Sequence, residues 1–186
     1  MSTYPRTIDN GLGERLTFVG VGRDERGEFL EVRNAVAPGA GPPMHVHQQQ
    51  EEAATVERGR LGYVVEGGPE QFAGPGASVT FAAGATHRFW NAGDDELVCT
   101  GTIRPPGNIE YFLTEIFASL RRAGGKRPGV FDAAYLSFRY RHEFAITEVP
   151  APVRRFVFPV IFVAGRLLGR HRRFAGAPQP LGPPAR

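Results

Sequence analysis

The chain has 186 residues, of which 41% are hydrophobic and 22% are charged. This length suits one domain with a real core plus an appendage, and the composition excludes a wholly disordered chain. The net charge of +3 conceals an asymmetry, because residues 151–186 carry seven arginines and no acid, which leaves about −4 for the residues before them. We therefore expect the basic character to belong to the carboxy-terminal segment and not to the body of the protein.

The amino terminus and the single cysteine bear on the compartment. Residues 1–18 hold no apolar run behind a basic start, so we expect no secretory signal. Cys99 cannot form an internal disulfide, which fits a reducing compartment. Its neighbours, "LVCTGT", are typical of a strand, and they favour a buried bystander thiol over a nucleophile. We thus expect a cytoplasmic protein.

Short β-branched and aromatic runs fill residues 14–104 and are separated by glycine and proline turn signals at intervals of roughly 8–12 residues. No helical period occurs between them. This pattern predicts an all-β sandwich or barrel over residues 14–104, with residues 1–13 as an amino-terminal arm.

The pattern changes after Pro105-Pro106-Gly107. Asn108 is a suitable N-cap, and Gly124 is a suitable stop signal. Between them, apolar residues recur at the spacing of one helix face: Ile109, Phe112, Leu113, Ile116, Phe117 and Leu120. We predict a helix whose apolar face covers the open side of the β-domain or a partner subunit.

Two further helical segments are predicted within a carboxy-terminal extension that spans residues 105–174. The first covers about residues 131–144. The second starts near Pro152 and contains the ten apolar residues 156–165, half of the ~20 that a bilayer span needs, so it is not a transmembrane helix. Two interpretations remain open: a helix packed on the barrel or a dimer partner, or an interfacial anchor with its arginines among phosphates. Residues 175–186 have the composition of a disordered tail.

Three of the five histidines occur in a pattern that suits metal binding. Because side chains alternate along a strand, His45 and His47 point to the same side of a strand. Glu52 follows five residues after His47 and can supply an anionic oxygen, and His87 stands at the start of a later strand. Such nitrogen and oxygen donors suit Fe, Mn, Ni, Zn or Cu. From this segment alone a second interpretation stays open, because "QQQEE" is also typical of a solvated turn.

The chain resembles the cupins in two motifs about thirty residues apart. The first motif runs G, five residues, H-x-H, four residues, E, six residues, G. The second runs G, five residues, P-x-G, two residues, H, three residues, N, and here Ala82 stands in place of the proline. The residues in register are Gly39, His45, His47, Glu52 and Gly59, then Gly76, Gly84, His87 and Asn91. More narrowly, "GERLTF", "GPPMHVH", "HRFWNAGD" and "GRLLG" resemble small bacterial cupins that carry a helical carboxy-terminal extension.

The resemblance covers about half of the chain and implies a small antiparallel β-barrel of jelly-roll type, the double-stranded β-helix of cupins. It implies that a divalent transition metal is bound inside this barrel by four ligands: His45, His47, Glu52 and His87.

Strand parity adds candidate pocket-lining residues on the faces of Glu52 and His87. They are mainly apolar, which favours an aromatic or lipid-like substrate over a phosphosugar. These residues are Ala54, Val56, Phe81, Phe89 and Asn91. Tyr63 and Glu66 are conceivable acid–base groups, but each is as consistent with a packing or surface role.

Two functional hypotheses follow. The first is a metal-dependent enzyme acting on a small organic molecule. A dioxygenase-like oxidoreductase is the leading reaction class, and an isomerase or lyase comes next. The second is a non-catalytic ligand- or metal-binding cupin that acts on a partner protein through its helical tail. We expect a homodimer and no specific nucleic-acid binding, because no helix-turn-helix fits before the barrel. Weak contact of the basic tail with a membrane surface stays open as an alternative.

Overall fold

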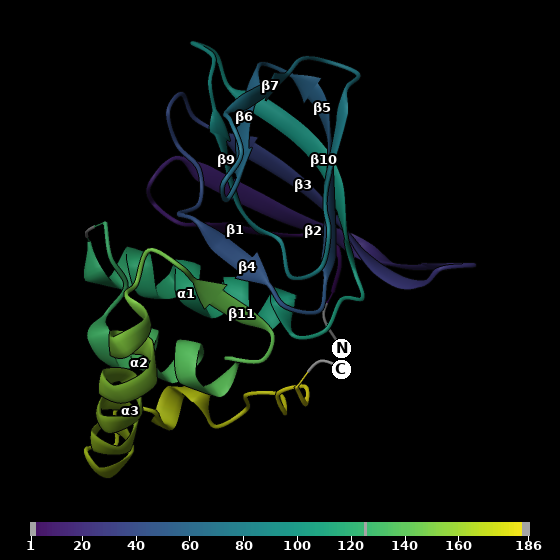
Figure 1. Cartoon of the computed structure of the whole chain (residues 1–186). Helices are drawn as coiled ribbons and strands as arrows, with labels where there is room; N and C mark the ends of the chain where they lie inside the picture. Colours follow the sequence, from purple (N-terminus) through teal and green to yellow (C-terminus); the bar gives the residue numbers. More distant parts are fainter. Residues whose placement is uncertain (1–2, 125, 184–186) are drawn as a thin grey trace.

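The computed structural model describes residues 3–124 and 126–183 and contains two antiparallel sheets that face each other (Figure 1). The six-stranded sheet has the order β1-β2-β3-β10-β5-β8, and the five-stranded sheet has the order β11-β4-β9-β6-β7. The strands are β1 (Arg6–Asp9), β2 (Glu14–Asp24), β3 (Gly27–Val36), β4 (His45–His47), β5 (Glu51–Arg58), β6 (Leu61–Val65), β7 (Gln71–Ala73), β8 (Ser78–Phe81), β9 (Thr86–Asn91), β10 (Leu97–Arg104) and β11 (Phe144–Ile146). The predicted all-β jelly roll is confirmed.

Alternation along the strands separates the core face from the solvent face. In β2, Leu16 and Phe18 are buried, while Arg15 between Glu14 and Leu16 is exposed. In β3, Leu30 and Val32 are buried on either side of the exposed Glu31. This period of two is the reason that one face of the sheet closes the barrel and the other meets water.

The predicted helical extension is also confirmed. It contains α1 (Ile109–Ala123), α2 (Val130–Arg139) and α3 (Phe158–Leu167), and a π-helical turn (Val153–Val157) leads into α3. α1 ends as predicted at Gly124, which adopts the left-handed conformation with φ of 62°. Its expected side-chain N-cap is absent, because the Asn108 side-chain amide donates to Glu143 and to the carbonyl of Gln179 instead.

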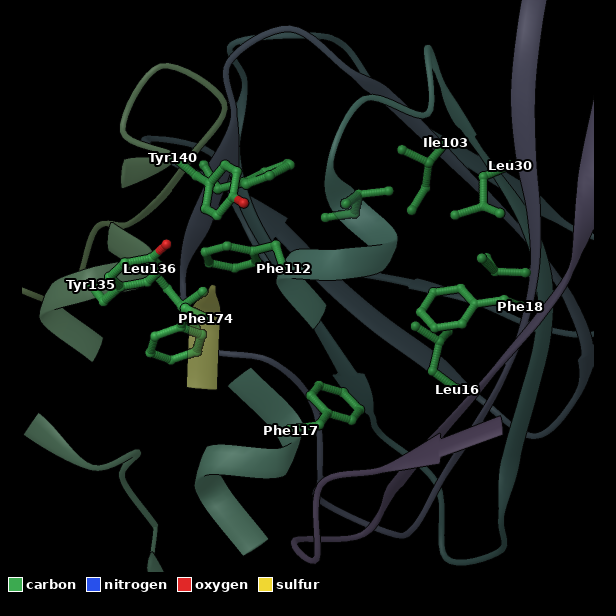
Figure 2. Close-up of a cluster of buried hydrophobic side chains, with 13 residues drawn as sticks. Leu16, Phe18, Leu30, Ile103, Phe112, Phe117, Tyr135, Leu136, Tyr140 and Phe174 are labelled. Atoms are coloured by element: carbon green, nitrogen blue, oxygen red, sulfur yellow. The ribbon is translucent and has the colours of Figure 1, made fainter. Parts of the chain in front are cut away.

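One hydrophobic cluster joins the extension to the barrel. Figure 2 shows apolar side chains of β2, β3 and β10 on one side of it and those of α1 and α2 on the other. The labelled members are Leu16, Phe18, Leu30, Ile103, Phe112, Phe117, Tyr135, Leu136, Tyr140 and Phe174. Each large apolar side chain buried in this way contributes about 1.5–3 kcal/mol. α1 therefore covers the open side of the barrel. Of the two predicted alternatives, the β-domain and a partner subunit, its apolar face packs on the first.

The helix predicted for residues 131–144 is too long. α2 ends at Arg139, and after a turn residues 144–146 form β11, which pairs antiparallel with β4. β4 has only three residues, and its outer edge would leave backbone donors and acceptors without partners. Pairing satisfies these groups and places Phe144 in the shared core, where its ring lies 4.7 Å from that of Phe112.

The last described residues form no regular secondary structure, yet they contact the rest of the molecule. Arg139 and the Tyr140 hydroxyl both donate to the carbonyl of Pro178. The backbone N–H of Leu181 donates to the fully buried carboxylate of Glu143, which also accepts from Asn108. Residues 175–183 belong to the tail predicted to be disordered, and residues 184–186 of that tail lie outside the described residues.

None of the helices in the described part of the chain combines the length and the apolar character that a membrane crossing needs.

Candidate metal centre

Three strands from both sheets bring four side chains together inside the barrel. His45 and His47 lie on β4, and His87 lies on β9 directly opposite His45. Glu52 comes from β5 in the other sheet. Each of the four offers one ligand atom, and these atoms all lie within 4.8 Å of one another. The cluster therefore bridges the two sheets and could hold a metal ion.

A single carboxylate oxygen lies at the centre of the cluster. Glu52 Oε2 is 3.9 Å from Nε2 of His45, 3.4 Å from Nε2 of His47 and 3.2 Å from Nε2 of His87. The side chain of His87 is 1% exposed and that of His47 is 7% exposed, whereas His45 and Glu52 retain 13% and 17%. Access from solvent is consequently on the side of His45 and Glu52.

The outer ring nitrogens orient two of the histidines. Nδ1 of His45 lies 2.9 Å from the carbonyl oxygen of Pro43, and Nδ1 of His87 lies 2.9 Å from that of Ala85. Because a carbonyl can only accept, each Nδ1 donates to its carbonyl, and each Nε2 faces Glu52 inside the cluster, where it is the ring atom available to a metal ion. Metal-binding histidines in proteins are held in this way by an outer hydrogen bond.

The electrostatics of the cluster also fit a cation. Although burial acts to raise it, the neighbouring imidazoles of His45 and His87 hold the pKa of Glu52 well below its ordinary value. Burial lowers the pKa of His47 to about 4, against the opposing charge of Glu52. Near neutral pH the site thus contains an anionic carboxylate and a neutral imidazole, the protonation states in which these groups bind metals. Three imidazole nitrogens and one carboxylate oxygen suit a borderline divalent transition metal.

Aromatic rings support the histidines from behind. The ring of Phe81 stacks on His87 with centroids 3.9 Å apart and planes 7° apart. Phe144 meets His47 edge-on at 5.6 Å. Strand parity predicts Phe81 as a neighbour of the site, but Phe144 comes from the extension and was not predicted there.

The other predicted lining residues lie in different surroundings. Val56 is 1% exposed and belongs to a second hydrophobic cluster, against which Ala54 and Phe89 pack. The side-chain amide of Asn91 donates to the carbonyls of Val36 and Asp95, so it closes the turn after β9. That any of these residues lines a substrate pocket stays a prediction. As for the conceivable acid–base groups, the Tyr63 hydroxyl donates to Gln71, and Glu66 is exposed.

A buried carboxylate near the cluster was missed by the sequence analysis. Glu14 on β2 accepts hydrogen bonds from the side-chain amides of Asn34 at 2.9 Å and Asn10 at 3.2 Å. Burial raises its pKa, against the hydrogen bond from Asn34, and the charges of His45 and Glu52 also act on it. Glu14 is two residues before Leu16 and four before Phe18, so strand alternation places its carboxylate on the same inward face. This spacing could have indicated the buried acid.

Comparison with known proteins agrees with this architecture. Residues 33–102 match the family model of the cupin domain, a segment that includes β4, β5 and β9 with all four clustered side chains. Residues 33–102 of this chain thus form a cupin domain.

Individual relatives share only part of the chain. An oxidoreductase named iacF from the fungus Pestalotiopsis fici is 33% identical over 87 residues, which are 46% of this chain and 43% of that protein. This chain therefore matches less than half of that relative's length. The solved structure of KdgF from Halomonas sp. has a TM-score of 0.45 at 19% identity and covers 53% of this chain and 86% of its own. A protein with a double-stranded β-helix domain from Klebsiella pneumoniae has a TM-score of 0.43 at 19% identity over 56% of this chain and 82% of its own.

Proposed function

We propose that this protein is a metal-dependent cupin that binds one divalent transition metal ion and acts on a small organic molecule. The ligands would be His45, His47, Glu52 and His87, and the candidate ions are Fe, Mn, Ni, Zn and Cu. The observation that carries the proposal is the convergence of four ligand atoms within 4.8 Å, with the Nε2 atoms of His45 and His87 turned into the cluster by hydrogen bonds at Nδ1.

The chain's own residues would prepare the site for catalysis. A metal ion with four protein ligands keeps one or two positions open and supplies Lewis acidity or, if it is redox-active, reactivity toward dioxygen. Phe81 covers the inner side of His87 and excludes water there. His45 and Glu52 are the more exposed ligands, so a substrate would approach over them.

The proposed reaction is the oxidation of an apolar or aromatic substrate by dioxygen, as in a dioxygenase-like enzyme. The aromatic side chains beside the cluster support such a substrate, because the ring of Tyr63 meets Phe81 edge-on at 6.0 Å and Phe81 stacks on His87. The partial likeness to an oxidoreductase points in the same direction. Isomerisation or elimination ranks second.

Metal content tests the site. Protein purified without added metal should contain about one transition metal ion per chain, since four ligands define one site. A double variant His45→Ala, His87→Ala should lose the ion and remain folded, as judged by circular dichroism. His142→Ala, which removes a histidine outside the cluster, is the matched control and should keep it. Equal metal content in the double variant and the wild type would refute the proposal.

Oxygen consumption tests the reaction. Protein loaded with Fe, Mn, Ni or Cu is offered flavonoids, thiols and aromatic diols, and at least one compound should drive oxygen uptake that Glu52→Ala abolishes. A protein that holds its metal but turns over no compound would support the second candidate, a non-catalytic cupin acting through a partner.

A further inference from the structure

The extension presents an apolar stripe to solvent along α3 and the π-helical turn before it. Its four members lie at i, i+4, i+7 and i+11, which is the spacing of one helix face. They are Phe156, Val160, Val163 and Leu167, with exposed fractions of 65%, 67%, 56% and 82%. We call these four residues the α3 stripe. Val157 and Leu168 widen it at its two ends, with exposed fractions of 45% and 66%.

The opposite side of α3 is firmly packed, so the stripe is held in one orientation. Phe162 stacks on Tyr135 with ring centroids 5.6 Å apart and lies 4.9 Å from the ring of Phe138. Gly165 is buried, and a side chain there would collide with His171 and Phe131. Figure 1 shows α3 stacked beside α2 and remote from the two sheets. The barrel therefore leaves the α3 stripe uncovered.

Arginines without acidic partners lie beside the α3 stripe. Four are exposed, in the π-helical turn, on α3 and just after α3: Arg155, Arg166, Arg170 and Arg172. Within residues 3–124 and 126–183 these four form no ion pair with a carboxylate, whereas Arg173 pairs with Asp132. Residues 151–186 contain no acid at all. The surface is consequently apolar along the stripe and carries cationic side chains beside it.

We propose that the α3 stripe docks on an anionic phospholipid surface, with α3 lying in the plane of the headgroups. Such a surface offers both partners that the face requires: acyl chains for the apolar side chains and phosphates for the arginines. The long arginine side chains can reach the phosphates while their methylene groups lie along the apolar layer. α3 has ten residues, which is too short to cross, so it lies on the surface.

A second copy of the chain fits this face less well. Two α3 stripes in contact would bring the arginines of both copies together, and residues 151–186 supply no carboxylate to neutralise them. Like charges at that separation repel, and their removal from water carries a further cost. The lipid proposal goes beyond the proposed function and does not depend on the metal centre.

Co-sedimentation with vesicles tests the proposal on the full-length chain. Vesicles of phosphatidylcholine mixed with phosphatidylglycerol should bind the wild type at least about tenfold more tightly than pure phosphatidylcholine vesicles do, and added salt should weaken this binding. Val160→Ser with Leu167→Ser removes exposed apolar side chains, and Arg155→Gln with Arg166→Gln removes charge. Each pair should reduce binding about tenfold or more.

Matched controls change the same residue types on the barrel. Leu12→Ser with Val21→Ser and Arg23→Gln with Arg26→Gln alter exposed residues and should bind vesicles as the wild type does. Circular dichroism checks that each variant is folded. If the serine pair unfolds, the arginine pair still tests the proposal, because it leaves the apolar stripe unchanged. The proposal fails if the wild type ignores anionic vesicles or if the serine pair binds them equally well. It fails too if light scattering shows a wild-type dimer that the serine pair converts to a monomer, since the stripe would then join two copies.

Discussion

Phe144 of the carboxy-terminal extension lies opposite His47 in the pairing of β11 with β4, and its ring meets that imidazole edge-on at 5.6 Å. Phe144 also packs against Phe112 of α1. A residue nearly one hundred positions away in sequence thus supports a candidate metal ligand, and the extension is part of the site's construction.

Phe144→Ala should therefore weaken both the fold and the metal site. Removing a buried phenylalanine costs about 3–5 kcal/mol through lost burial and the cavity left behind. We expect a correspondingly lower free energy of unfolding in denaturant and a lower metal content, because the His47 ring loses its support. Phe72→Ala, at a site that is 49% exposed, is the control and should change both measurements little. Unchanged metal binding in Phe144→Ala would show that β11 does not position His47.

Truncation tests the proposed boundary between barrel and extension. A chain that ends at Gly107 loses every helix and exposes the side of the barrel that carries Leu16, Phe18 and Leu30. We expect aggregation or a much reduced yield of soluble protein, measured by size-exclusion chromatography. A chain that ends at Phe174 loses the hydrogen bonds of the last segment and the packing of Ala177 on the hydrophobic cluster. It should stay soluble, with stability lower by about 1–3 kcal/mol from the lost hydrogen bonds. A soluble, folded product from the shorter chain would make the barrel an independent unit.

The cysteine gives a prediction about pH. Burial raises the pKa of the Cys99 thiol from an ordinary 9.0 to about 11, with a smaller contribution from the charge of Glu57. Between pH 9 and 11 the unfolded chain holds fewer protons at this group than the folded chain does, so its contribution to stability falls as pH rises through that window. Below pH 9 the contribution is constant.

Unfolding midpoints of the wild type and of Cys99→Ala, measured from pH 8 to 10, check this sign. The wild type should lose more stability than the variant over the upper half of the range. Iodoacetamide should label the native thiol slowly at pH 8 and rapidly in denaturant. Parallel pH profiles for the two proteins would contradict the assignment of the effect to Cys99.

Glu14 gives a prediction about buried polar groups. Asn34 donates to Glu14 through its amide nitrogen, while its side-chain oxygen is buried without a partner among the described residues. Glu14→Gln supplies an N–H that can donate to this oxygen, so we expect a stability change within about 1 kcal/mol. Glu14→Leu instead leaves the amides of Asn10 and Asn34 unpaired and should cost about 1–3 kcal/mol for each. Denaturant unfolding of the two variants separates these outcomes, and equal losses would refute the account.

The sequence predicted the fold class from the spacing of its strands and turns, and the resemblance to the two cupin motifs implied that the four clustered side chains converge. His45 and His47 share a face by strand parity, and the motif around His87 places that residue on a second strand. Phe144 could not be found this way, since three apolar residues after a helix carry too little periodicity to identify a strand. Its partner, β4, lies far away in the chain.

Two other differences have tertiary causes. Asn108 was expected to cap α1 with its side chain, but its side-chain amide donates to Glu143 and to the carbonyl of Gln179. Glu14 was not predicted to be buried, because a single acid at the start of a strand is typical of the surface. Only the pairing with the neighbouring strand shows that Asn34 supplies a hydrogen-bond donor to this inward carboxylate.

The pairing of β11 with β4 also decides where a neighbouring chain could add a strand. β4 would otherwise form an open edge of the five-stranded sheet, and an open edge is a template for joining two sheets. The protein closes that edge with a strand from its own carboxy-terminal half, and β7 is the other terminal strand of the sheet. A second chain that adds a strand to this sheet would therefore have to pair with β7 or with the outer side of β11. The edge of β4 is already paired within a single chain.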